Sequence, residues 1–364
     1  MHGFTWQTGP WHGMCSEKVD WIVETDTTPW RLFVWFQGDM ECAMKNNGNI
    51  LFATDFSESA RPVQRYAFDF AKRTGATLHI IHVVDEMRFT AVGLYGFGGF
   101  VSDGVEVAKE FARTDLAEVI RVAIANDVPT EPHLALGTPG SKICTMAEEL
   151  GCSLIIVGTH GRSGFSKLFF GSTCEQVLRL SRVPVLTVRQ HEDLKPDKVP
   201  VVPPKRILCP CDLTDLSRQA LPLAASACKD FGASLILMHV VDTRVEYPMF
   251  APTAAHPHVE ELRRSAQKQM KSMAESLEDL SPDVAVITGV PHHEIIETAR
   301  FGNIDLLVMA THGRSGLAHA LLGSTTEKVV RSVPCPVLTM RPREKSSHAQ
   351  WEKASREAAT HTGA

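Results

Sequence analysis

One glycine-spaced stretch occurs twice in this chain, and it constrains the fold more than any other feature. The two copies are GTHGRSGFSKLFFGST at 158–173 and ATHGRSGLAHALLGST at 310–325. Each copy follows a short apolar run, SLIIV at 153–157 and DLLVM at 305–309, whose length is typical of a buried parallel strand. Each copy therefore begins where a strand ends, and its Gly-Ser-Thr leads into an amphipathic helix.

The spacing within each copy is typical of a phosphate-binding loop. Nine residues separate Gly161 from Gly171, and nine separate Gly313 from Gly323. Glycine lets the backbone approach a ligand, and the first turn of a helix offers unpaired N–H groups with a partial charge of about +0.5. A loop that only turns the chain is the alternative, which the repetition disfavours. The anion seats predicted on this basis are Gly171, Ser172 and Thr173 in the first copy and Gly323, Ser324 and Thr325 in the second.

The repeat extends well beyond this stretch. RILCPCDLT at 206–214 corresponds to NILFATDFS at 49–57, and HVVD at 239–242 corresponds to HVVD at 82–85, both at an offset of 157 residues. From Gly289 onward the offset is 152, so the length difference falls in a connector and not in the motifs. The expected divisions are a Trp-rich extension at 1–46, a first domain at 47–190, a linker at 191–203, a second domain at 204–342 and a polar tail at 343–364.

Alternating strand and helix patterns within each unit predict an α/β fold. We expect two tandem doubly wound, Rossmann-like parallel sheets with helices on both faces. Ligands of such sheets bind at the carboxyl ends of the strands. In the first unit these ends lie at Asp55, Asp85 and Gly158.

Composition limits the function classes. The formal charge of −5 disfavours a nucleic-acid-binding surface. The longest early apolar run, LFVWF at 32–36, is too short for a membrane span. Nine cysteines without paired CxxC spacing indicate reduced core thiols, and Cys209-Pro-Cys211 leaves metal or redox use as a second interpretation. Met44 is a candidate for the true start, in which case the preceding extension is a gene-model artefact.

Each unit resembles a universal stress protein domain in three features. These are the Gly-x2-Gly-x9-Gly-Ser/Thr motif, the TDFS-like end of the first strand and the HVVD of the second. The resemblance implies a five-stranded parallel sheet in each unit, cytoplasmic location and dimerisation through the last strand. It also implies ATP or a related adenine nucleotide as ligand, with a role for Mg²⁺ left open.

Site residues follow from the same resemblance, position by position. Asp55 and Asp212 would lie near adenine or ribose, and Val83 and Val240 would line the adenine pocket. The residues that would hold ribose and phosphates are Gly158, Gly161, Gly171 and Ser172 in the first unit and Ala310, Gly313, Gly323 and Ser324 in the second.

Several positions carry two interpretations. For Arg162 and Arg314, one interpretation is contact with a phosphate and the other is simple exposure to solvent. For His160, one interpretation is a general base, and the other, which we favour, is a hydrogen-bonding residue of the turn. Ala310 replaces the first glycine of the motif, which predicts a weaker second site.

The last strands, VPVLTVR at 183–189 and CPVLTMR at 335–341, would each leave a bare edge. We expect them to pair within one chain as a pseudo-dimer, or between chains as a homo-oligomer. The favoured function is a stress-response protein whose ATP state biases assembly or partner contacts. The alternatives are a slow ATPase or nucleotide hydrolase at the same site, and a structural dimer module with vestigial sites.

Overall fold

The computed structural model describes six parts of the chain, which cover most of the two expected domains. These parts are residues 48–86, 101–159, 171–189, 203–242, 257–312 and 322–342. The expected extension at 1–46, the tail at 343–364 and all but the last residue of the linker at 191–203 lie outside these parts.

The first unit alternates strands and helices in the predicted order. Its elements are β1 (Asn49–Ala53), α1 (Ala60–Thr74), β2 (Thr77–Val84), α3 (Val101–Ala125), β3 (Thr130–Leu136), α4 (Pro139–Glu149), β4 (Cys152–Gly158), α5 (Ser172–Leu180) and β5 (Val185–Val188).

The second unit repeats this order with two short additions, one helix before its first long helix and one 3₁₀ helix before its third strand. Its elements are β6 (Arg206–Pro210), α6 (Asp215–Arg218), α7 (Ala220–Phe231), β7 (Ser234–Asp242), α8 (Pro257–Glu275), the 3₁₀ helix η2 (Glu278–Leu280), β8 (Asp283–Gly289), α9 (Pro291–Phe301), β9 (Leu306–Ala310), α10 (Ser324–Ser332) and β10 (Val337–Met340).

Glycine and proline set matching helix boundaries in the two units. Gly75 ends α1 and Gly232 ends α7, both at φ 65°, a left-handed conformation that glycine adopts without strain. Pro139 and Pro291 stand in the first turns of α4 and α9, where a missing N–H breaks no helical hydrogen bond.

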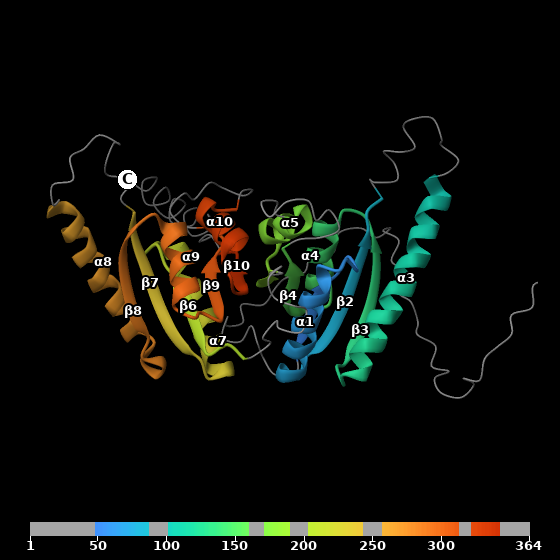
Figure 1. The fold of residues 1–364 in the computed structure, drawn as a ribbon, viewed down its shortest axis with the longest axis horizontal. Helices are drawn as coiled ribbons and strands as arrows, with labels where there is room; N and C mark the ends of the chain where they lie inside the picture. The colour runs from blue at the N-terminus through green and yellow to red at the C-terminus, as the bar shows by residue number, and fades with distance from the viewer. Residues whose placement is uncertain are drawn as a thin grey trace, which may run out of the picture.

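The two units share one ten-stranded sheet, in the order β3-β2-β1-β4-β5-β10-β9-β6-β7-β8 (Figure 1). Each half is a parallel five-stranded sheet of the expected kind. The halves meet where β5 and β10 pair antiparallel, with Leu186 opposite Leu338. The last strands therefore pair with each other inside one chain, the first of the two arrangements considered above.

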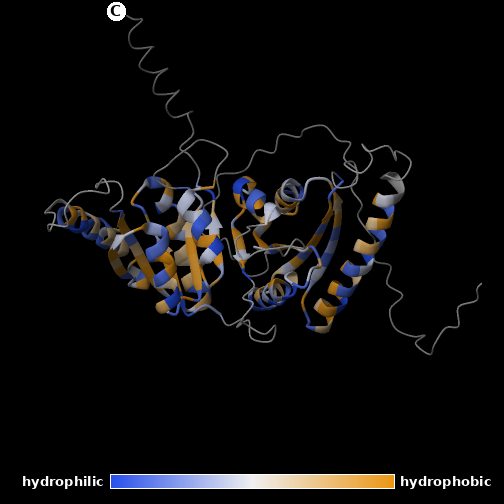
Figure 2. Cartoon of the chain, turned by 45° about the horizontal axis from the view of Figure 1, so that its top comes forward, coloured by the Kyte–Doolittle hydropathy of each residue, from blue (hydrophilic) through white to orange (hydrophobic). Residues whose placement is uncertain are grey.

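Helices cover both faces of the sheet, as the doubly wound fold requires. One face packs against α1, α3, α7 and α8, and the other packs against α4, α5, α9 and α10. Figure 1 shows α3 and α8 beyond the outer strands β3 and β8. Figure 2 shows α3 as an amphipathic helix, with apolar and polar residues alternating along it. Among the described helices, none combines the length and the apolar character that a membrane span requires.

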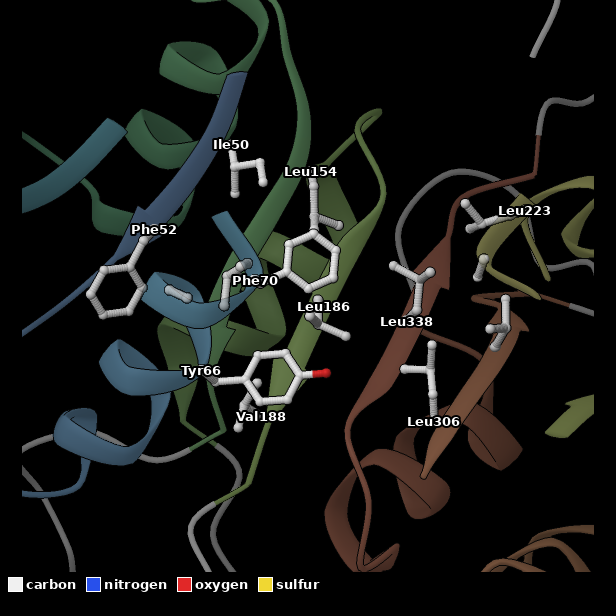
Figure 3. Close-up of a cluster of buried hydrophobic side chains, with 14 of the residues drawn as sticks. Ile50, Phe52, Tyr66, Phe70, Leu154, Leu186, Val188, Leu223, Leu306 and Leu338 are labelled. Atoms are coloured by element: carbon white, nitrogen blue, oxygen red, sulfur yellow. The ribbon is translucent and has the colours of Figure 1, made fainter. Parts of the chain in front are cut away.

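The hydrophobic core continues from one unit into the other. Leu186 of β5 and Leu338 of β10 belong to the same buried cluster, which Figure 3 shows on both sides of the junction. Phe70 of α1 meets Phe231 of α7 edge to face, with ring centroids 5.7 Å apart. The junction is therefore built like a domain interior.

Candidate functional site: two clefts at the strand ends

A cleft of about 740 Å³ lies over the carboxyl ends of β1, β2 and β4. Its volume is within the range of about 300–1,000 Å³ that is usual for small-molecule sites. The predicted site residues that line it are Asp55, Val83, Gly158, Gly171, Ser172 and Thr173. Every predicted first-unit residue inside the described ranges therefore lies in one cleft.

Asp55 is held in a fixed orientation at the rim of this cleft. Its Oδ1 accepts hydrogen bonds from the backbone N–H and the hydroxyl of Ser57, at 3.1 and 2.6 Å. Asp212 accepts the same two bonds from Thr214, at 3.0 and 2.6 Å. The sequence repeat thus builds the same carboxylate-bearing turn twice.

The residue after each aspartate has a strained backbone. Phe56 has φ 61° and Leu213 has φ 68°, in the left-handed region that costs a residue other than glycine about 1–3 kcal/mol. The N–H of Phe56 donates to Thr54 Oγ1 at 3.1 Å, and that of Leu213 donates to Cys211 Sγ at 3.4 Å. Backbone strain of this kind concentrates at functional sites.

Two histidines tie these turns to the neighbouring strands. The Nδ1 atom of His82 lies 2.8 Å from the carbonyl oxygen of Thr54, and that of His239 lies 2.7 Å from the carbonyl oxygen of Cys211. Both side chains are buried, as their apolar strands suggest. The apolar pattern of the two strands does not reveal this bond from each histidine to the strand end.

The amino terminus of α5 opens into the first cleft. The first hydrogen bond of this helix runs from the N–H of Glu175 to the carbonyl of Gly171, at 3.0 Å. The N–H groups of Ser172, Thr173 and Cys174 therefore have no partner within the helix, and no side chain caps it. These three residues line the cleft, and two of them, Ser172 and Thr173, belong to the predicted anion-binding positions.

Gly171 differs from the prediction in its role. Its backbone is extended at φ −62°, which any residue can adopt, and its N–H already bonds the carbonyl of Thr159 at 2.9 Å. The corresponding N–H of Gly323 bonds the carbonyl of Thr311, also at 2.9 Å. A Cβ added to Gly323 would lie 2.9 Å from that same oxygen. Glycine is therefore needed at Gly323 for the close approach of the strand end to the helix.

A second, smaller cleft of about 280 Å³ occupies the equivalent place in the second unit. The predicted residues that line it are Asp212, Val240, Ala310, Gly323, Ser324 and Thr325. Ala310 is buried and packs in the core cluster that contains Val308 and Met340. His312 also lines this cleft, and its Nδ1 lies 2.9 Å from the hydroxyl of Thr311.

Helix α3 contributes residues to the first cleft that sequence reasoning missed. Phe111 and Asp115 line the cleft together with Asp85 at the end of β2. Three carboxylates, those of Asp55, Asp85 and Asp115, therefore line it, and the described lining includes no Lys or Arg. Their contribution depends on how a helix packs over strand ends, which sequence spacing does not reveal.

Five predicted site residues lie outside the part of the chain that the structure describes. They are His160, Gly161, Arg162, Gly313 and Arg314.

The described cysteines are buried free thiols. They are Cys144, Cys152, Cys174, Cys209, Cys211, Cys228 and Cys335. Burial raises the pKa of each thiol, to about 12 at Cys152 and about 11 at Cys228, so the thiolate is disfavoured at neutral pH. This agrees with the core-thiol interpretation of Cys209 and Cys211.

Known proteins share both the sequence pattern and the fold. A universal stress protein of Mycolicibacterium smegmatis is 25% identical over 304 residues, or 81% of this chain and 97% of that protein. One of Methanocaldococcus jannaschii is 32% identical over 143 residues, or 39% of this chain and 84% of that protein. The crystal structure of a universal stress protein from Archaeoglobus fulgidus, 24% identical, matches the fold with a TM-score of 0.56 over 80% of this chain and 98% of that one.

The family model described as the universal stress protein family matches the chain twice, at residues 46–189 and 203–341. Together the two matches include both five-stranded halves of the sheet and both clefts. The chain therefore belongs to the universal stress protein family, as a member with two tandem domains.

Proposed function

We propose that this protein is a nucleotide-binding stress-response protein that takes ATP, or a related adenine nucleotide, in the first cleft. The observation that carries the proposal is the amino terminus of α5. Ser172, Thr173 and Cys174, whose N–H groups have no partner within the helix, line a cleft of suitable volume. Converging backbone donors with a positive partial charge are a seat for phosphate.

Charge sets the orientation of the nucleotide. Asp115 belongs to α3, which packs on one face of the sheet, whereas α5 packs on the other. Phosphates are repelled by carboxylates and attracted by the start of a helix, so they belong on the α5 side. Asp55, held by Ser57, accepts hydrogen bonds from ribose hydroxyls or the adenine amino group, and Val83 packs against the base.

The second cleft is the weaker site in this proposal. It has the same helix amino terminus at Ser324 and the same aspartate turn at Asp212. Its volume of about 280 Å³ is just below the usual range for ligand pockets, whereas the first cleft is well inside it.

A bound nucleotide would change the surface of the protein at α3. Phe111 lines the first cleft and is 70% exposed, so a base bound beside it would bury an aromatic ring that otherwise faces solvent. The ATP state would therefore change the surface that partners meet.

The decisive variant is Ser172→Asp. Ser172 is exposed at the first turn of α5, where a carboxylate stabilises the helix while repelling a phosphate. Calorimetric titration of ATP should show a loss of about tenfold or more in affinity, or about 1.4 kcal/mol. Adenosine, which has no phosphate, should lose less than about threefold by the same reasoning. The matched variant Ser324→Asp should leave the tighter site unchanged.

Parent-like ATP affinity and stoichiometry in Ser172→Asp would overturn the phosphate assignment. An unchanged or higher melting temperature confirms that the variant is folded. Titrations with MgCl₂ and with EDTA test whether the metal accompanies the nucleotide. Phosphate release in the same samples separates binding from hydrolysis, and mass spectrometry of the denatured parent identifies any nucleotide retained during purification.

A further inference from the structure

Three side chains with metal-ligand chemistry meet on the outer strands of the first unit. His79 of β2 lies directly opposite Glu131 of β3, and His133 is two residues further along β3 on the same face. One ligand atom from each residue lies within 4.8 Å of the others. No predicted site includes these residues.

The two imidazoles are in direct contact, and one of their ring nitrogens has no hydrogen-bond partner among the described residues. His79 Nδ1 lies 2.9 Å from His133 Nε2 and 3.4 Å from Glu131 Oε2. Both histidines are buried, and the Nε2 atom of His79 has no hydrogen-bond partner in the described structure. A buried polar atom without a partner costs about 1–3 kcal/mol, so the contacts within the cluster do not fully satisfy the imidazole of His79.

The donor set and its surroundings suit a metal ion. Imidazole nitrogen and carboxylate oxygen are metal ligands, and here two buried imidazoles lie beside one carboxylate. The Glu131 carboxylate supplies a negative charge, and its side chain is 61% exposed, which gives an ion access from solvent.

We propose that His79, Glu131 and His133 form a binding site for one Zn²⁺ ion. Zn–N bonds of about 2.0–2.1 Å in tetrahedral geometry place neighbouring ligand atoms about 3.3 Å apart. His79 Nδ1 lies 2.9 Å from His133 Nε2 and 3.4 Å from Glu131 Oε2, on either side of this value, and the three ligand atoms all lie within 4.8 Å of one another. Side-chain movements would complete the geometry. Two imidazoles and one carboxylate suit zinc and not Mg²⁺ or Ca²⁺, which take oxygen ligands. Water on the Glu131 side would fill the fourth position.

This site is separate from the nucleotide clefts. His79 is four residues before Val83 on β2, which corresponds to about 13 Å along a strand. A zinc ion there would fasten the edge strand β3 to β2. The same register in the second unit holds Ile236 opposite Asp283, with Ala285 in place of the second histidine. The site is therefore built in only one of the two units.

The second unit supplies substitutions that this fold already accepts. The double variant His79→Ile, His133→Ala copies Ile236 and Ala285. ZnCl₂ should be titrated into metal-free, untagged full-length protein by calorimetry. The parent should bind one tight Zn²⁺ at this site and melt at a higher temperature with zinc. The double variant should lose affinity by about 100-fold or more, because both nitrogen ligands are gone. Asp283→Asn is the matched control and should bind as the parent does.

The single variant Glu131→Gln provides a second test of the zinc site, which can be used if the double variant does not fold. Because Glu131 is exposed, this change should leave the fold intact and weaken zinc binding by about tenfold or more. Co²⁺ in place of Zn²⁺ should give the visible absorption of a tetrahedral nitrogen and oxygen site. Parent-like zinc affinity in Glu131→Gln, or a sulfur-to-cobalt charge-transfer band, would overturn the proposal.

Discussion

The imidazole of His82 and the carbonyl of Thr54 join the second strand to the end of the first, with 2.8 Å between Nδ1 and the oxygen. A carbonyl can only accept, so His82 is the donor and carries its proton on Nδ1. The ring also contacts Phe56, the strained residue beside Asp55, with ring centroids 4.5 Å apart and ring planes tilted by 32°. This histidine therefore supports the turn that presents the aspartate to the first cleft.

Replacing His82 by Phe should keep the ring contact and remove the donor. The buried Thr54 carbonyl would lose its side-chain partner, at a cost of about 1–3 kcal/mol in the free energy of unfolding. Urea denaturation measures this loss, and ATP titration should show weaker binding at the first cleft. His239→Phe, the matched change in the second unit, should destabilise similarly without weakening first-cleft binding. Equal effects of both variants on that affinity would contradict the prediction.

Phe111→Ala should weaken ATP binding without unfolding the protein. The ring lines the first cleft and is 70% exposed, so it adds little to the core. Stacking of a base on an aromatic ring is worth about 1–3 kcal/mol, and we expect a loss of about five- to tenfold. Phe301→Ala removes a ring that is 75% exposed in the second unit and should change nothing. If the two variants bind ATP equally well, α3 does not contact the base.

The sequence was sufficient to predict the alternation of strands and helices and the edge of the sheet at which the clefts lie. Apolar runs bounded by glycine and proline predicted the strands, and parallel strands place their carboxyl ends at one edge. Asp55 and Ser172, more than a hundred residues apart, could thus be assigned to one site.

Contacts that depend on packing could not be predicted in this way. Phe111 reaches the first cleft only because of how α3 lies across the sheet. The His79–Glu131 pairing depends on the register between two strands that a long helix separates. His79 sits within an apolar strand pattern that by itself indicates a core residue.

Leu338→Ala should destabilise both halves of the molecule together. Leu338 is fully buried and lies opposite Leu186 at the antiparallel junction, inside one core cluster that spans both units. Truncation of a buried leucine costs about 2–5 kcal/mol. Hydrogen exchange should therefore quicken in β1 as well as in β6. The exposed Leu180→Ala serves as the control, and loss of protection confined to the second unit would show that the halves unfold independently.

Gly323→Ala should destabilise the protein although the glycine backbone is not strained. At φ −58° alanine fits the local conformation, and it would even reduce the entropy of the unfolded chain. However, its Cβ would lie 2.9 Å from the carbonyl oxygen of Thr311, which also accepts the N–H of residue 323. The strand end and α10 must then move apart. We expect a loss of about 1 kcal/mol or more in the free energy of unfolding, which lowers the melting temperature by about 1–2 °C per kcal/mol in a protein of this length.

The neighbouring variant Ser324→Ala serves as a control. It separates the steric effect at Gly323 from any effect of losing a hydrogen-bonding side chain at the amino terminus of α10. Ser324 is exposed and forms no capping bond, so calorimetry should show almost no shift in its melting temperature. If Gly323→Ala melts at the same temperature as the parent, the amino terminus of α10 moves away from the Thr311 carbonyl at little energetic cost. In that case packing would not require the glycines that precede α5 and α10, Gly171 and Gly323. Weaker ATP binding in Gly171→Val would then indicate that the added side chain obstructs the phosphate.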